Sequence, residues 1–311
     1  MIAVLSVVAG LAILLIGGDL LVRGAVNLAL RLGVPALIVS LTIVAFGTSA
    51  PELLISVDSV LQDAGGLALG NVVGSNIANV LLVLGVPALI SRLATGDPAT
   101  RHSYLIMLAA SALFIVVCFL GPITWIGGLI LLAVLATILT GQFREARAHA
   151  EAAPDDLDLG DTHMPWPKVW LFLIAGLIGL PLGAHLLVEG AVTLAEAFGV
   201  SDRVIGLTLI AIGTSLPELA TTVVAAMRRQ AEVALGNVIG SNLFNLLGII
   251  GVTAMIGPIP VDSSFVRFDL WVMLAASLAL APFVFGWRNL TRRWGTLFLG
   301  LYVAYLILVV V

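Results

Sequence analysis

The chain of 311 residues is 60% hydrophobic and only 10% charged, with a formal net charge of −4 and a mean hydropathy of +1.17. A soluble domain carries about 25% charged residues, so this composition excludes a soluble globular protein. Apolar runs of membrane-spanning length recur along the whole sequence and predict an integral helical membrane protein. The single cysteine, Cys118, cannot form an internal disulfide.

Hydropathy and turn residues predict an all-α protein with ten transmembrane helices. In chain order, we expect the spans at residues 2–27, 34–61, 67–90, 103–120, 122–141, 167–194, 201–227, 233–256, 268–286 and 295–311. No secretory signal peptide is expected, because the first basic residue, Arg23, follows the first apolar run instead of preceding it.

The longest polar stretch, FREARAHAEAAPDDLDLGDTHMPWPK, lies between the fifth and sixth predicted spans. It is too short to form a domain, and we interpret it as a solvated acidic linker instead of a regulatory ion site. The predicted organisation is a first five-helix repeat at 1–141, a cytoplasmic acidic linker at 142–166 and a second, inverted five-helix repeat at 167–311.

The division into two halves is based on an internal repeat, because three stretches of the first half return 166 residues later. The pairs are GTSAPE (47–52) with GTSLPE (213–218), GNVVGSNIAN (70–79) with GNVIGSNLFN (236–245), and LLVRGAV (20–26) with LLVEGAV (186–192). One shared offset over this length indicates that the two halves are related.

The two halves must lie upside down relative to each other, because each contains five spans, an odd number. With the N-terminus outside, twelve of the fourteen basic residues fall at predicted cytoplasmic ends, as the positive-inside rule requires. These twelve are Arg23, Arg31, Arg92, Arg101, Arg144, Arg147, Lys168, Arg228, Arg229, Arg288, Arg292 and Arg293. We therefore expect a multi-pass protein of the plasma membrane or cell inner membrane with both termini outside. Inverted repeats are typical of transporters with a substrate site near the bilayer midplane.

The second and seventh predicted spans each carry a carboxylate, Glu52 and Glu218, roughly midway through the hydrocarbon core. A bare charge at that depth costs about 3 kcal/mol on insertion scales. The sequence has no Lys or Arg at comparable depth that could pair with either glutamate. The remaining partners are a proton or a bound cation.

The neighbours of these glutamates favour a cation. In a helix, Thr48 and Ser49 share a face with Glu52, and Pro51 removes the N–H that would pair with the Gly47 carbonyl. The other oxygen-bearing pairs at a spacing of four are Thr214 with Glu218, Ser75 with Asn79, and Ser241 with Asn245. Ca2+ and Na+ prefer such oxygen ligands. The four histidines have no spacing that would indicate a transition-metal site.

Small residues and further asparagines surround the oxygen stripes. Gly70 with Gly74, and Gly236 with Gly240, form small-xxx-small stripes that allow close helix packing. The remaining asparagines point off the oxygen stripes, and we interpret them as packing or capping groups; they are Asn71, Asn76, Asn237 and Asn242.

The paired motifs AFGTSAPE with GNVVGSNIAN, and AIGTSLPE with GNVIGSNLFN, resemble the alpha repeats of the sodium/calcium exchanger family, within the cation/Ca2+ exchanger superfamily. The resemblance covers essentially the whole chain. It implies that the second, third, seventh and eighth helices form an ion-binding core. It also implies that the long first and sixth helices slide against this core during alternating access.

The resemblance also implies a set of ion ligands. The Ca2+ site would use the carboxylates of Glu52 and Glu218 and the backbone carbonyls of Thr48 and Thr214. The Na+ sites would use Ser49, Ser215, Ser75, Ser241 and the carbonyls of Ala45 and Ala211, with Asn79 and Asn245 at the centre. Some members of the family, including the potassium-dependent branch, have Asp at the position of Asn245. The neutral side chain here predicts a protein that does not require K+.

The expected function is antiport of Na+ against Ca2+, with export of Ca2+. A proton/Ca2+ or other divalent-cation exchanger of the same superfamily remains the nearest alternative. A channel is disfavoured by the inverted repeat, and an intramembrane hydrolase would need a water-activating pair. No ATP-binding motif is present, so transport is expected to be secondary. We expect no enzyme activity, no cofactor, no nucleic acid and no obligatory protein partner, with Ca2+, Na+ and the lipid bilayer as the molecules bound.

Overall fold

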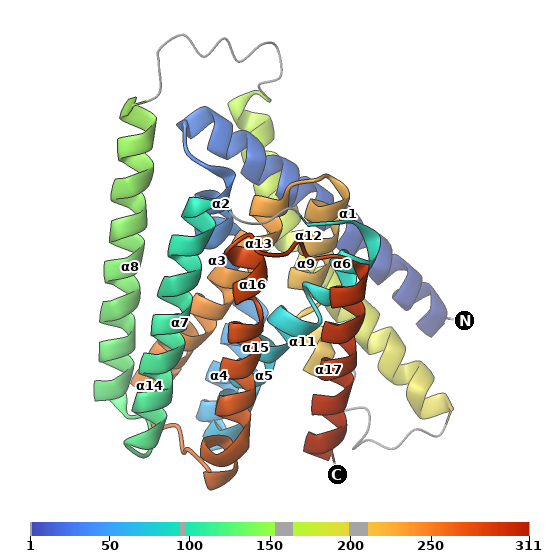
Figure 1. Ribbon diagram of the computed structural model, residues 1–311. Coiled ribbons are helices and arrows are strands. Elements are labelled where there is room, and N and C mark those ends of the chain that lie inside the picture. The colour runs from blue at the N-terminus through green and yellow to red at the C-terminus, as the bar shows by residue number, and fades with distance from the viewer. Residues whose placement is uncertain (1, 94–96, 153–163, 199–210, 311) are drawn as a thin grey trace.

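The structure is a computed structural model, and it describes residues 2–93, 97–152, 164–198 and 211–310. These residues are almost entirely helical, as predicted (Figure 1). The first half contains α1 (Ile2–Leu32), α2 (Ala36–Val39), the π-helical η1 (Ser40–Val44), α3 (Ala45–Thr48), α4 (Ala50–Leu61), α5 (Gly65–Leu81), α6 (Gly85–Ile90), α7 (Pro98–Phe119) and α8 (Trp125–Ala152).

The described part of the second half has its long helices in a similar order. It contains α9 (Trp166–Ala197), α11 (Ala211–Thr214), α12 (Leu216–Met227), α13 (Ala231–Leu243), η3 (Phe244–Ile249), α14 (Ile250–Ile256), η4 (Phe265–Asp269), α15 (Leu270–Ala279), α16 (Ala281–Val284) and α17 (Arg292–Val310).

The described helices match the predicted spans in order. Eight helical segments are long and apolar enough to cross a membrane, and the bent pair Ala36–Thr48 with Ala50–Leu61 gives a ninth. The predicted seventh span at 201–227 lies partly outside the described residues, and α12 is its apolar end. One boundary differs: α8 continues through Ala152, so 142–152 of the expected linker is helical. The Ala, Glu and Arg residues there favour helix and extend it beyond the apolar part.

Each half contains a broken helix at its acidic motif. Ser49 separates α3 from α4 with φ −84° and ψ 5°, and the two helical segments are bent by 44°. Ser215 has almost the same backbone angles, φ −86° and ψ 4°, between α11 and α12. Pro51 and Pro217 follow in the first turn of the next helix, where a missing N–H costs nothing. The sequence repeat is therefore also a repeat of the local backbone.

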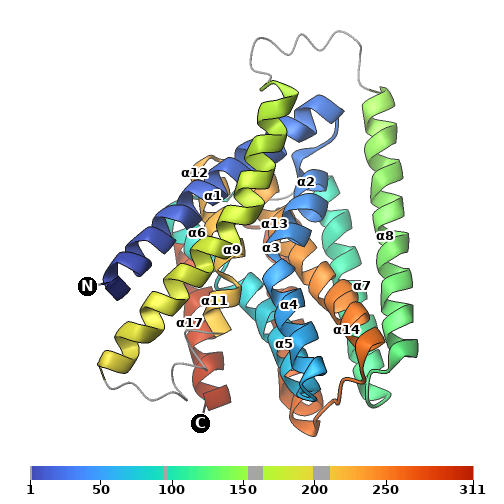
Figure 2. The ribbon, with the colours of Figure 1, turned by 180° about the vertical axis from the view of Figure 1, so that it is seen from behind.

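The long helices α1 and α9 run side by side in opposite directions across the outside of the bundle (Figures 1 and 2). Each helix has a glycine at every seventh position of the contact. A Cβ built on Gly10 would lie 2.5 Å from the Leu187 backbone nitrogen, and one built on Gly176 would lie 2.8 Å from the Gly17 carbonyl oxygen. Only glycine allows the two backbones to approach this closely. The glycines are Gly10, Gly17 and Gly24 in α1 and Gly176, Gly183 and Gly190 in α9.

An ion pair connects α1 to the central helices. Asp19 pairs with Arg23 one turn later at 3.0 Å. Asp19 also pairs with Arg228, which follows the end of α12. The first helix is thus tied by charge to the helix that carries Glu218.

The helices α4, α5, α12 and α13 lie at the centre of the molecule. Gly240 of α13 packs against η1 and α3, because a Cβ built on it would lie 2.6 Å from both the Leu41 carbonyl oxygen and Ala45 Cβ. This is the close approach that the small-residue stripe of the second half predicts. A Cβ built on Gly74 meets nothing within 4 Å among the described residues.

Candidate ion-binding site

Two glutamates lie buried at the centre of the bundle. Glu52 is 1% exposed and Glu218 is 0% exposed. Each occupies the first turn of its helix, α4 or α12, where the unpaired N–H groups of the helix end favour negative charge. Ser49, three residues before Glu52, contacts the Glu218 carboxylate. The inverted halves therefore bring both predicted carboxylates to one place.

The hydroxyl groups of the first motif face the glutamate of the second. Ser49 Oγ donates a hydrogen bond to Glu218 Oε1 at 3.1 Å, and Thr48 Oγ1 donates to Asn237 Oδ1 at 3.3 Å, also in the second half. The Ala45 carbonyl accepts bonds from the Ser49 N–H at 3.0 Å and from Thr48 Oγ1 at 3.3 Å. The first half thus contributes polar groups to the surroundings of the glutamate in the second half.

The structure gives two of the asparagines a more specific role than packing. Asn71 Nδ2 donates to the Glu52 carbonyl oxygen at 3.2 Å and to Ser56 Oγ at 3.0 Å. Its counterpart Asn237 donates to the Glu218 carbonyl oxygen at 3.3 Å, and also to Thr222 Oγ1 at 3.1 Å. Each asparagine fixes the main chain of the glutamate in its own half. The common offset of 166 residues is the signal that could have identified this role.

The other asparagines join the two halves directly. Asn79 Nδ2 donates to Asn242 Oδ1 at 3.1 Å, and Asn245 Nδ2 donates to Asn76 Oδ1 at 3.0 Å. Asn76 Nδ2 also donates to the Asn242 carbonyl oxygen at 3.3 Å. All four side chains are buried. Asn76 and Asn242 therefore orient the two asparagines that the resemblance assigns to the centre of the site.

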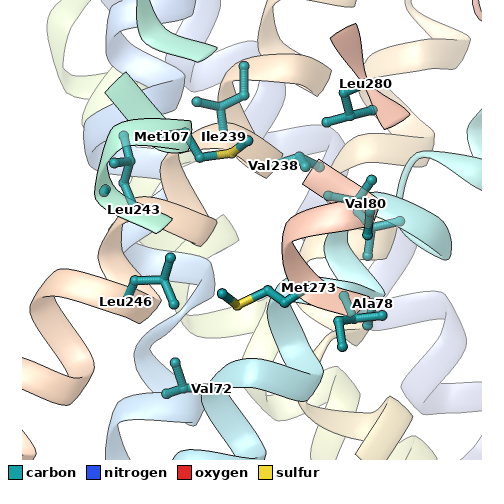
Figure 3. Close-up of a cluster of buried hydrophobic side chains, with 14 of the residues drawn as sticks. Val72, Ala78, Val80, Met107, Val238, Ile239, Leu243, Leu246, Met273 and Leu280 are labelled. Carbon is teal, nitrogen blue, oxygen red and sulfur yellow. The ribbon is translucent and has the colours of Figure 1, made fainter. Parts of the chain in front are cut away.

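A methionine from each half lies behind these asparagines. Met273 Sδ is 4.0 Å from Asn76 Nδ2, and Met107 Sδ is 3.8 Å from Asn242 Nδ2. Met107 and Met273 are themselves 166 residues apart. Figure 3 shows both within a cluster of buried apolar side chains that includes Ile239. The polar centre is thus backed by a packed apolar wall on this side.

Several buried oxygen atoms of the predicted ligand set have no hydrogen-bond partner within the described part of the chain. They are Oε2 of Glu52 and Glu218, Oδ1 of Asn79 and Asn245, and Oγ of Ser215 and Ser241. A buried polar atom without a partner costs on the order of 1–3 kcal/mol, and native proteins contain few of them. All six are oxygen atoms, the kind of ligand that hard cations such as Ca2+ and Na+ prefer.

The remaining predicted ligands are also placed near the break in each half. Thr48, Thr214 and Ser75 are buried, at the ends of α3 and α11 and on α5. Ala211 begins α11, and only its backbone is described. Among the described residues, no group of three or more His, Cys, Asp or Glu side chains could hold a metal ion. The constellation therefore consists of two carboxylates with neutral oxygen donors.

Two inverted halves that bury carboxylates and unpartnered oxygens between them define the class of secondary ion transporters. Within that class, the chain belongs to the sodium/calcium exchanger protein family, whose sequence profile matches residues 2–144 and 168–311. It is therefore a multi-pass membrane protein that exchanges cations, Ca2+ among them, and not an enzyme.

Similar proteins cover nearly the whole chain. The sodium/calcium exchanger MaX1 of Methanosarcina acetivorans is 34% identical over an alignment that covers 96% of this chain and 95% of that protein. The inner membrane protein YrbG of Escherichia coli K12 is 33% identical over 294 residues, 93% of this chain and 90% of that protein. A solved structure of the sodium-calcium exchanger NCX_Mj superposes with a TM-score of 0.84 at 33% identity, covering 98% of this chain and 97% of NCX_Mj.

Proposed function

We propose that the protein exchanges Na+ for Ca2+ by alternating access and exports Ca2+ from the cytoplasm. Membership of the family supports cation/Ca2+ exchange, and the sodium/calcium exchanger MaX1 supports Na+ as the coupling ion. The observation that carries the proposal is the set of six buried oxygen atoms without a partner in the described chain. Bound cations would supply the missing interactions.

In the proposed site, Ca2+ is bound by the carboxylates of Glu52 and Glu218 and by the carbonyls of Thr48 and Thr214. Na+ is bound by Ser49, Ser215, Ser75, Ser241 and the carbonyls of Ala45 and Ala211, with Asn79 and Asn245 at the centre. The Ala45 carbonyl already accepts two hydrogen bonds, so Na+ binding there requires the Thr48 hydroxyl to turn away. The fit of the other side chains is supported by their burial.

The charge of the site explains exchange without leak. Two ionised carboxylates give the site a charge of −2, which one Ca2+ or two Na+ would neutralise. A site that carries uncompensated charge meets a high barrier when it moves through the membrane interior, because desolvated charge is expensive. Only the ion-loaded forms then cross easily, so one ion must return before the next can leave.

The two halves, 1–141 and 167–311, act as the two inverted repeats of this cycle, and the segment 142–166 connects them on the cytoplasmic face. Both termini then lie outside, an orientation supported by the positive-inside rule. In the proposed motion, α1 and α9 move together against the central helices. Their close backbone contact through glycine supports movement as one body.

Reconstituted liposomes provide the test. The purified full-length protein is placed in vesicles loaded with Na+, and uptake of Ca2+ is followed after dilution into Na+-free medium. We expect Ca2+ uptake that saturates and that disappears when internal Na+ is replaced by choline. A pH gradient in the absence of Na+ forms the second arm of the experiment.

The arms separate the possible outcomes. Ca2+ uptake driven by the pH gradient alone would replace the Na+ proposal with proton-coupled exchange. Ca2+ flux that needs no counter-ion and does not saturate would contradict exchange altogether. The same vesicles without protein give the background leak.

A further inference from the structure

A cavity of about 590 Å3 lies far along the chain from the acidic motifs, at the junction of α6 and α17. It is lined by Ile90, Arg92, Thr291, Arg292 and Arg293. None of these residues belongs to the proposed ion site. The cavity therefore needs an explanation of its own.

The fold holds the walls of this cavity in place. The Leu93 N–H donates to the Leu290 carbonyl at 3.1 Å, which joins the segment after α6 to the segment before α17. Ser91 Oγ donates to the Ala226 carbonyl at 3.0 Å, which anchors the end of α6 to the last turn of α12. Thr291 directly precedes α17, and its carbonyl accepts the Gly295 N–H at 2.9 Å. The backbone on both sides of the cavity is thus fixed before any ligand binds.

The three arginines bring unbalanced positive charge to this cavity. Arg92, Arg292 and Arg293 are exposed, and none makes a salt bridge with an acidic residue in the described part of the chain. An arginine side chain stays charged at any physiological pH, so the three groups repel one another. The planar guanidinium group fits phosphate oxygens with two parallel hydrogen bonds. An anion with phosphate oxygens would relieve the repulsion.

The inverted repeat provides an internal comparison at the opposite membrane face. There the bridge between Ile123 and Ile259 joins the segments before α8 and after α14 in the same way. In the register that the two bridges set, the positions that correspond to the three arginines are uncharged: Pro258, Trp125 and Ile126. The repeated backbone arrangement therefore does not need arginine.

The surroundings of the cavity point to a lipid as the source of the phosphate. Trp287 is 72% exposed next to it in the chain, and tryptophan is enriched at the level of lipid headgroups. Ile90 and Leu89 of α6 and Leu297 of α17 expose apolar surface towards the bilayer. We propose that this cavity binds the phosphate of an anionic phospholipid, with the acyl chains along α6 and α17. Basic pockets between membrane helices are known to recognise such headgroups.

The test measures lipid binding to the full-length protein in detergent by native mass spectrometry. The probes are phosphatidylglycerol, phosphatidylcholine and inorganic phosphate. We expect preferential binding of phosphatidylglycerol, with affinity about fivefold lower for each arginine removed in R92Q and in R292Q/R293Q. The matched control is R144Q/K168Q, which removes two positive charges from α8 and α9. These two residues are expected to lie at the same membrane face as the cavity. Elution of each variant as a single species from a size-exclusion column checks that it is folded. If R292Q/R293Q is not folded, R92Q alone is compared with the wild type.

Several results would overturn the proposal. If phosphatidylcholine bound as tightly as phosphatidylglycerol, the cavity would not distinguish headgroups by their charge. Equal losses in R292Q/R293Q and R144Q/K168Q would show that the arginines act only through overall charge. Displacement of phosphatidylglycerol by millimolar inorganic phosphate would assign the cavity to the free anion instead of a lipid. Retention of preferential phosphatidylglycerol binding by R144Q/K168Q, with its loss in the arginine variants, would support the proposal.

Discussion

Ser49 in the first half of the chain donates a hydrogen bond to Glu218 in the second half, at 3.1 Å. The pair that the repeat relates to this one is Ser215 with Glu52. Ser215 Oγ and Glu52 Oε2 have no hydrogen-bond partner in the described chain. The sequence symmetry of the site is therefore not matched by symmetric hydrogen bonding.

This difference predicts unequal effects of two equivalent substitutions. S49A removes a hydrogen bond to a carboxylate and should lower the stability of the ion-free protein by about 1.5–3 kcal/mol. S215A removes a hydroxyl without a partner and should change stability by a few tenths of a kcal/mol at most. Thermal unfolding in detergent with a chelator and without Na+ measures both. Equal shifts of the melting temperature would contradict the asymmetry.

The two-carboxylate site predicts that E52Q and E218Q each abolish Ca2+ uptake into liposomes. Either substitution removes one of the two charges that balance Ca2+, while the amide keeps the shape of the side chain. Both variants should remain folded but lose the rise in melting temperature that Ca2+ causes in the wild type. D262N is the control, because Asp262 is an exposed acid outside the site. Wild-type uptake in either glutamine variant would refute the account.

Asn245 predicts transport that does not depend on K+. Its Nδ2 already donates to Asn76 Oδ1 at 3.0 Å, so a neutral amide completes a bond that a carboxylate could not make. Replacing all K+ by choline in the liposome assay should leave the Ca2+ flux unchanged. Flux that disappears without K+ would show this prediction to be wrong.

The same bond predicts the effect of N245D. The new carboxylate would face the Asn76 oxygen with no donor between them and would add a third charge to the site. We expect a loss of stability of about 1–3 kcal/mol in the ion-free protein. Na+ or Ca2+ should restore part of this loss by neutralising the added charge, which thermal unfolding with and without ions would detect. Unchanged stability would mean that the Asn76 amide turns at no cost.

The packing of α13 on η1 predicts that G240A destabilises the fold. The added methyl group would lie 2.6 Å from the Leu41 carbonyl oxygen and from Ala45 Cβ, so backbone must shift. Overpacking of this kind costs about 1–3 kcal/mol. In G141A the added methyl meets nothing within 4 Å among the described residues, and stability should stay near that of wild type. Comparable melting temperatures for the two variants would contradict the tight contact.

Much of the architecture follows from the sequence, because hydropathy and a fixed offset carry that information. The offset relates Glu52 to Glu218, and the structure buries both, with Ser49 of the first motif in contact with Glu218. The proline after each break predicts where the helices are interrupted. By contrast, the π-helical segments Ser40–Val44 and Phe244–Ile249 depend on tertiary packing and have no local signal.

The candidate site was less predictable than the fold. Asn71 and Asn76 were interpreted as packing or capping groups, because their spacing places them off the oxygen stripe. Their actual partners, the Glu52 carbonyl and Asn242, lie on other helices, and helical spacing contains no information about such contacts. The glycines of α1 and α9 recur every seven residues in both halves, a pattern that a closer comparison of the halves could have detected.

The ion pair between Asp19 and Arg228 would make the proposed transport cycle uneven in energy. At the positions related by the repeat stand His185 and Gln62, which pair within their own helices with Glu189 and Asp58. Among the described residues, the two related positions therefore form no ion pair with each other, and only on one side would an ion pair have to break for α1 to move against α12. Dissolved salt weakens such an ion pair by screening its charges. Raising the ionic strength should thus speed the opening of one face and leave the opposite step almost unaffected.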